Sequence, residues 1–146
     1  MPHPIFEVDM NYPKFYRLRK NESAITTPLG PCVGLALIDQ TNSIGGVGHF
    51  YDTIGSINDI KTAMAELIGD TDPSGILAIA RGAAPLGGGE YVTETLQSRR
   101  NIRRILKELN IPDSNTNIHW LPDCFSSARV GLRFDLQPIF RLKDGR

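Results

Sequence analysis

The stretch Val33-Gly34-Leu35-Ala36-Leu37-Ile38 is apolar on both faces, and Ile44-Gly45-Gly46-Val47-Gly48-His49-Phe50 follows it after a short polar segment. A short apolar run that is bounded by turn residues is typical of a central strand. Residues 39–43 are Asp-Gln-Thr-Asn-Ser, which supplies the turn chemistry for a hairpin. We therefore expect residues 33–38 and 44–50 to form two neighbouring strands at the centre of the fold.

A turn rich in proline and glycine, Thr26-Thr27-Pro28-Leu29-Gly30-Pro31-Cys32, leads into this hairpin. Because a hairpin brings the start of its first strand beside the end of its second, Cys32 and His49 are expected to lie close together. A thiol is a nucleophile as the thiolate, and an imidazole takes and returns protons near neutral pH. The pair is a candidate nucleophile and base, and Thr26 or Thr27 is the candidate for orienting the imidazole.

The remaining pattern predicts an α+β protein. Extended segments are expected at residues 15–19, 24–27, 76–80, 118–121, 131–135 and 138–142. Apolar residues at helical spacing predict one helix that ends at Gly69 and another from Tyr91 to Leu109. Residues 1–14 carry three prolines and no periodicity, so we expect an N-terminal arm. About seven strands and two helices without strict alternation indicate a single α+β domain over residues 1–146.

The composition argues against several partners. Sixteen basic residues balance sixteen acidic ones, which leaves no long-range field to attract nucleic acid or an anionic membrane surface. No apolar run approaches the roughly 18 residues of a spanning helix, and the N-terminus lacks the regions of a secretory signal. We therefore expect a cytoplasmic protein. Cys32 and Cys124 have no partner Cys or His at zinc-ligand spacing, so no metal is expected.

Simpler interpretations of the same residues remain open. A free cysteine is commonly a small buried apolar residue, and a histidine at the end of a strand is often structural. The run Gly87-Gly88-Gly89 before the second helix lacks the lysine and hydroxyl residue that end a phosphate-binding loop, so we interpret residues 82–89 as a flexible connector.

The residues around the candidate pair resemble a known active-site pattern. Thr26, then Leu-Gly-Pro-Cys-Val at residues 29–33, then Gly-Gly-Val-Gly-His-Phe at residues 45–50, is similar to the pattern of the CheD family of chemoreceptor glutamine deamidases. That pattern runs Thr, then Leu-Gly-Ser-Cys-Val, then Gly-Gly-x-Ala-His-Phe. This chain departs from it at Pro31 and Gly48, and weaker similarity extends over residues 15–143.

The resemblance implies a β-sandwich-like core with the helices packed outside, shared with toxin deamidases of the cytotoxic necrotizing factor type. It implies Cys32 as nucleophile, His49 as general base and acid, and Thr26 as the orienting residue, with no cofactor. The reaction would convert glutamine side chains of a chemoreceptor-like protein substrate to glutamate and release ammonia. A CheC-like phosphatase is the implied partner.

Two other functions are compatible with the same pattern. One is related amide chemistry, such as transglutamination or thiol-dependent peptide hydrolysis, in which the acyl acceptor or the substrate differs. The other is a catalytically silent CheD-like binding module that docks on a signalling protein. The complete set of Thr26, Cys32 and His49 favours an enzyme over the silent module.

Overall fold

The computed structural model describes residues 4–10, 14–51, 53, 57–85 and 89–143. The strands in these ranges are β1 (Ile5–Val8), β2 (Tyr16–Arg17), β3 (Ser23–Thr26), β4 (Val33–Asp39), β5 (Ile44–Phe50), β6 (Ile76–Gly82), β7 (Thr116–Trp120), β8 (Ser127–Leu132) and β9 (Pro138–Lys143). The α-helices are α1 (Ile57–Ile68) and α2 (Gly89–Glu108), and short 3-10 helices, η1 (Pro73–Gly75) and η2 (Asp113–Asn115), precede β6 and β7. None of the helices in the described ranges is long and apolar enough to cross a membrane.

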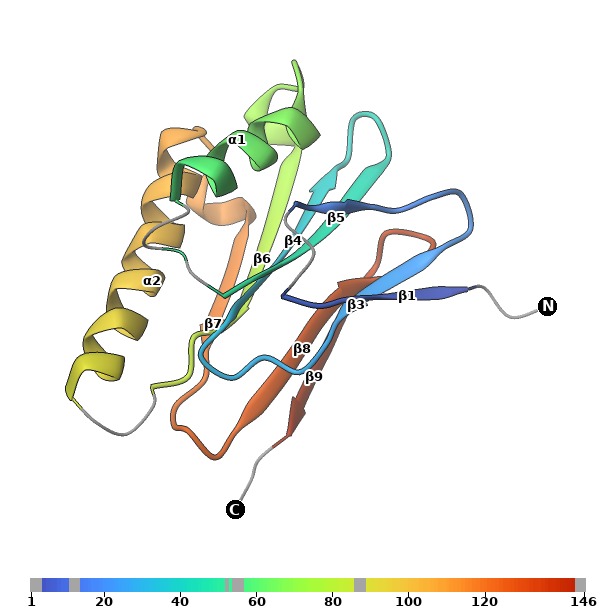
Figure 1. Ribbon diagram of the computed structural model, residues 1–146. Coiled ribbons are helices and arrows are strands. Elements are labelled where there is room, and N and C mark those ends of the chain that lie inside the picture. The colour runs from blue at the N-terminus through green and yellow to red at the C-terminus, as the bar shows by residue number, and fades with distance from the viewer. Residues whose placement is uncertain (1–3, 11–13, 52, 54–56, 86–88, 144–146) are drawn as a thin grey trace.

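The strands form two mixed sheets that pack face to face (Figure 1). The larger sheet has the order β2-β5-β4-β6-β7, and the smaller has the order β1-β3-β8-β9. Both helices cover the face of the five-stranded sheet that points away from the small sheet (Figure 1). The predicted α+β class with helices packed outside is therefore confirmed, with more strands than the expected seven or so.

The central hairpin is the one that the apolar runs predict. β4 and β5 pair along their whole length in antiparallel register, and every residue of β4 is buried. Leu35 and Leu37 pack under the helices, whereas Ala36 and Val47 belong to the cluster between the two sheets. Each fully buried leucine or valine of this kind contributes about 1.5–3 kcal/mol of hydrophobic stabilisation. The hairpin is buried on both faces because it lies between two layers.

The N-terminal segment differs from the expected arm. Residues 5–8 form β1, which pairs in parallel with β3, and the side chain of Val8 is fully buried. The Ser23 N–H donates to the Pro4 carbonyl at 2.9 Å and fixes the start of this pairing. Four residues are too few to show a strand period in the sequence, and the pairing depends on β3, which is distant along the chain.

The last strands and α2 also differ in detail from the expectation. β8 ends at Leu132, and the turn that follows places Leu136 at φ 62°, whereas an extended segment was expected at 131–135. Helix α1 ends at Ile68, and Gly69, the predicted stop, follows it with a φ of 61°. On α2 the apolar spacing that predicts the helix includes Leu96, but Leu96 is 40% exposed, and the neighbouring Thr95 is buried instead.

Candidate functional site

The hairpin brings the candidate nucleophile and base to one face of the five-stranded sheet. His49 lies directly opposite Gly34 in the pairing of β4 with β5, and Cys32 lies two residues before Gly34. In a regular sheet such diagonal neighbours are about 7–8 Å apart. Cys32 packs with Ala36 and Val47 in the cluster between the sheets, so its side chain is on the same face as the imidazole. Both side chains are nearly inaccessible, at 7% exposure for Cys32 and 3% for His49.

One nitrogen of the His49 ring is held by two oxygens. Nδ1 lies 3.1 Å from the Val8 carbonyl oxygen and 3.1 Å from the Thr27 hydroxyl oxygen. A carbonyl oxygen only accepts hydrogen bonds, so Nδ1 carries the proton and donates it. The neutral ring is therefore the tautomer with a bare Nε2.

The second ring nitrogen has no partner. Nε2 of His49 is the buried side-chain atom that, among the described residues, makes no hydrogen bond, and the Cys32 thiol is not bonded to it. Buried polar atoms are paired in the great majority of cases, and leaving one unpaired costs about 1–3 kcal/mol. An unpaired nitrogen with a free lone pair, on the same face of the sheet as a buried thiol, is what a base that awaits a proton requires.

Burial keeps both groups neutral. Burial lowers the pKa of His49, and the hydrogen bond to the Val8 carbonyl and the negative charge of Asp9 oppose this shift. Burial also raises the pKa of the Cys32 thiol. The resting site at neutral pH therefore holds a thiol and an imidazole, without a thiolate–imidazolium pair.

The two threonines of the turn have different neighbours. The Thr26 hydroxyl, which the family resemblance assigned to orientation of the imidazole, accepts a hydrogen bond from the Val130 N–H at 3.1 Å. This bond ties β3 to β8 across the small sheet. Thr27 is the threonine whose hydroxyl contacts the ring, so the structure selects it from the two that the sequence left open.

The turn that carries Cys32 is held by residues at the end of β6. The Ala83 N–H donates to the Cys32 carbonyl at 2.9 Å, and the Ala84 N–H donates to the Gly30 carbonyl at 2.8 Å. Gly82 has φ 101°, and an added Cβ there would lie 2.2 Å from the Cys32 carbonyl oxygen. Only glycine fits this position. The first part of the expected flexible connector is thus fixed against the turn, whereas residues 86–88 lie outside the described part of the chain.

Arg99 places a positive charge next to the segment that follows β6, and the sequence did not indicate it as part of the site. Arg99 of α2 donates from Nε and Nη2 to the Ala83 carbonyl, at 3.2 and 2.9 Å, and from Nη2 to the Leu121 carbonyl at 2.9 Å. Burial lowers the pKa of this guanidinium. Arg99 belongs to a run of basic residues on α2, and nothing in the local sequence distinguishes it from its neighbours. Its role here is to join the ends of β6 and β7.

The other thiol and the titratable clusters do not form a second centre. Cys124 is exposed, unlike Cys32. Within the ranges that the structure describes, no group of three or more His, Cys, Asp or Glu side chains is arranged to hold a metal ion.

Comparisons with known proteins identify the fold. No family model matches the sequence, and no curated protein matches it. The structure resembles the Bacillus licheniformis hypothetical protein YfiH, at 15% identity and a TM-score of 0.54, over 73% of this chain and 49% of that chain. It also resembles YlmD from Geobacillus stearothermophilus, at 15% identity and a TM-score of 0.51, over 68% of this chain and 47% of that chain. The chain spans about half the length of these two proteins.

These findings correct the family resemblance. The structures reported above are YfiH and YlmD and not CheD proteins, so membership in the CheD family is wrong, and so is the inferred deamidation of chemoreceptor glutamines. The alternative function, a catalytically silent CheD-like binding module, is wrong for the same reason. The short motif is misleading because several of its residues are required by the packing of this fold. Thr26 bonds to the Val130 N–H, and Cβ atoms at Gly45 and Gly46 would lie 2.6 Å from Leu136 and 2.4 Å from Leu67.

Proposed function

We propose that this chain is a thiol-dependent hydrolase that attacks the carbonyl carbon of a small acyl substrate. Cys32 is the nucleophile, His49 is the general base and acid, and Thr27 with the Val8 carbonyl orients the imidazole. The observation that carries the proposal is the unpaired Nε2 of His49, which is buried on the same face as the thiol.

The tautomer supports the assignment of the base. Because Nδ1 is held as a donor by the Val8 carbonyl at 3.1 Å, the lone pair of the neutral ring is on Nε2. The charge of Asp9 favours the imidazolium that forms after the ring accepts a proton. The lowered pKa of His49 keeps the ring unprotonated at neutral pH, and a base must start in that state.

The steps follow from these two groups. The Cys32 thiol gives its proton to Nε2 while sulfur forms a bond to the carbonyl carbon, and the imidazolium then protonates the leaving group as its bond to that carbon breaks. A water molecule next gives a proton to Nε2 and attacks the thioester carbonyl. The carbon–sulfur bond breaks, the thiol recovers its proton, and the acid is released.

The burial of the pair supports a small substrate. At 7% and 3% exposure, Cys32 and His49 are not within reach of a bulky group on a large protein surface. A short acyl chain therefore suits this site better than a folded partner does.

The test is acylation of the protein by 4-nitrophenyl acetate, followed by intact mass measurement after an acid quench. We expect one acetyl adduct on Cys32, its absence in Cys32→Ala, and its retention in Cys124→Ser. In His49→Ala, acylation and turnover are expected to slow by about 10²- to 10⁴-fold, the usual contribution of a positioned base. An adduct that persists in Cys32→Ala, or a wild type that takes up no acetyl group, would show that Cys32 and His49 serve packing alone.

A further inference from the structure

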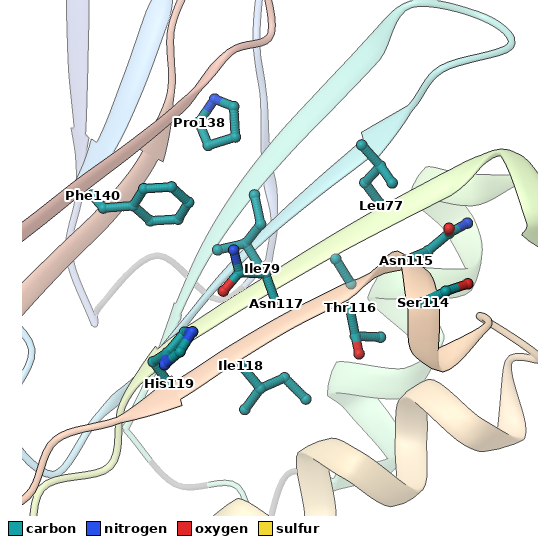
Figure 2. Close-up of a pocket in the computed structure, with 11 residues that line it drawn as sticks. Leu77, Ile79, Ser114, Asn115, Thr116, Asn117, Ile118, His119, Pro138 and Phe140 are labelled. Atoms are coloured by element: carbon teal, nitrogen blue, oxygen red, sulfur yellow. The ribbon is translucent and has the colours of Figure 1, made fainter.

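A groove opens between the two sheets on the side where β7 and β9 are their edges. Its volume is about 480 Å³. Figure 2 shows Pro138 and Phe140 of β9 on one side of this space and Ile79 and Asn117 across from them. The consecutive residues 114–119, which include most of β7, line the groove. We call it the β7 groove.

The backbone of β7 presents unpaired groups toward the open side. In the part of the chain that the structure describes, β7 pairs with β6 alone. The Leu121 N–H donates to the Gly82 carbonyl at 2.8 Å, so the odd-numbered residues of β7 direct their backbone groups toward β6. The even-numbered residues direct theirs away. The Thr116 N–H bonds to the Asp113 carbonyl, which leaves the N–H and C=O of Ile118 and the N–H of Trp120 for another strand.

The other edges of the two sheets carry features that block strand addition. β2 consists of two residues only. β9 begins with a proline, which has no N–H, and it carries Arg141 and Lys143. β1 is four residues long and includes Glu7. By contrast, β7 reads Thr-Asn-Ile-His-Trp, without proline, lysine or an acidic residue. Exposed edges without such protection are templates for pairing with another chain.

Charge around the β7 groove favours an acidic occupant. The Arg81 guanidinium lies 4.4 Å from the centre of the Phe140 ring and donates to the Ala80 carbonyl and to both oxygens of Asn117. All these acceptors are neutral, and no carboxylate among the described residues forms an ion pair with Arg81. A carboxylate in the groove would compensate this excess.

We propose that the β7 groove binds an extended, acidic segment of a partner protein as a sixth strand of the five-stranded sheet. Main-chain hydrogen bonds to Ile118 and Trp120 supply affinity, and alternate side chains of the segment enter the groove. Apolar side chains there pack against Phe140 and Ile79, and acidic side chains meet Arg81. The groove opens on the same inter-sheet side as Cys32, but neither Cys32 nor His49 lines it, so the inference is independent of the proposed hydrolase activity.

The probe is a fluorescein-labelled peptide of four Val-Glu repeats, and binding is followed by fluorescence anisotropy. A peptide of four Val-Lys repeats controls for charge. Two further versions, N-methylated at every valine or at every glutamate, remove the main-chain donors of one edge or the other. We expect the Val-Glu peptide to bind, the Val-Lys peptide not to bind, and one methylated version to lose at least tenfold in affinity.

Two variants and one measurement on the wild type locate the contact. Ile118→Pro removes an N–H that points away from β6, so the ladder to β6 is kept while affinity falls about tenfold, the value of one to two hydrogen bonds. Arg81→Gln is expected to weaken binding more than Arg100→Gln, a matched change at an exposed position of α2. Because a variant can fail to fold, amide hydrogen exchange of the wild type is measured as well. The amides of Ile118 and Trp120 should exchange more slowly with peptide present.

Three results would overturn the proposal. The first is equal binding of both methylated peptides and the Val-Glu peptide, which would indicate electrostatic attraction without strand addition. The second is unchanged exchange of the Ile118 amide at saturating peptide. The third is a dimer in analytical ultracentrifugation that Ile118→Pro abolishes, since the edge would then be covered by a second copy of this chain.

Discussion

His49 and the edge strand β7 both leave hydrogen-bonding groups without a protein partner among the described residues, and the two places differ in their access to water. Nε2 of His49 is buried between the two sheets, whereas the Ile118 backbone groups face an open groove. Water satisfies the groups at the edge at little cost, but the buried nitrogen costs about 1–3 kcal/mol. The energetic cost of the unpaired Nε2 supports a catalytic role for His49. The solvated edge of β7 is suited instead to binding another chain.

The largest expected effect concerns the rigid turn that holds the buried site. Gly82→Ala places a Cβ 2.2 Å from the Cys32 carbonyl at φ 101°, so we expect the free energy of unfolding to fall by about 3 kcal/mol or more. Gly30→Ala, on the same turn but facing open space, is the matched control and should change stability by less than about 0.5 kcal/mol. Urea unfolding measures both. Equal losses of unfolding free energy in the two variants would mean that the close packing of Gly82 against the Cys32 carbonyl does not stabilise the protein.

The second prediction separates function from stability at the buried nitrogen. His49→Leu removes the unpaired Nε2, and the Val8 carbonyl keeps its bond from the Thr27 N–H at 3.0 Å. We expect the free energy of unfolding to change by less than about 1 kcal/mol, because removal of the unpaired atom offsets the lost packing. Val47→Ala on the same face should cost about 2 kcal/mol by opening a cavity. A large loss of stability in His49→Leu would assign the histidine to structure.

The third prediction uses acid to test the same residue. The pKa of His49 is lowered by burial, so the unfolded chain binds a proton more readily than the folded protein. Stability is therefore lost as the pH falls through the unfolded value of 6.5 toward the folded pKa, and it is fully present above 6.5. Urea unfolding at pH 7.5 and pH 5 should show a smaller loss in His49→Leu than in the wild type. The same acid sensitivity in both proteins would contradict this origin.

The smallest expected effect lies at the open edge. Phe140→Leu keeps an apolar side chain but removes the ring that stacks with Arg81, and we expect a loss of about 0.5–1 kcal/mol, the value of an exposed cation–π contact. Phe125→Leu is the control, since Phe125 is 68% exposed. Indistinguishable unfolding of the two variants would show that the stack of Arg81 on Phe140 contributes no stability, and that the hydrogen bonds to Ala80 and Asn117 hold the guanidinium in place.

The sequence predicts the parts of the fold that depend on local pattern. The apolar runs predict the central hairpin, and the hairpin alone brings Cys32 and His49 to one face. The stop of α1 at Gly69 follows from the same kind of local signal. None of these features requires knowledge of which segments meet across the fold.

The features that the sequence did not predict depend on contacts between distant segments. The choice of Thr27 over Thr26 follows from the path of a turn between two sheets, and the Val8 carbonyl reaches the imidazole through β1, which no periodicity indicated. The edge at β7 is open because, among the described residues, β7 pairs with β6 alone. The misleading family motif shows the same limit, since glycines needed for packing look like glycines needed for catalysis.

The hydrogen bond from Nδ1 to the Val8 carbonyl has a practical consequence for handling the protein. The acceptor belongs to a four-residue strand near the N-terminus, so trimming the chain past residue 8 removes the group that sets the tautomer of His49. The proton can then move to Nε2 and turn the base into a donor. Affinity tags for enzymatic assays therefore belong at the C-terminus, beyond β9, and N-terminal cleavage during purification should be monitored by mass before any loss of activity is assigned to a substitution.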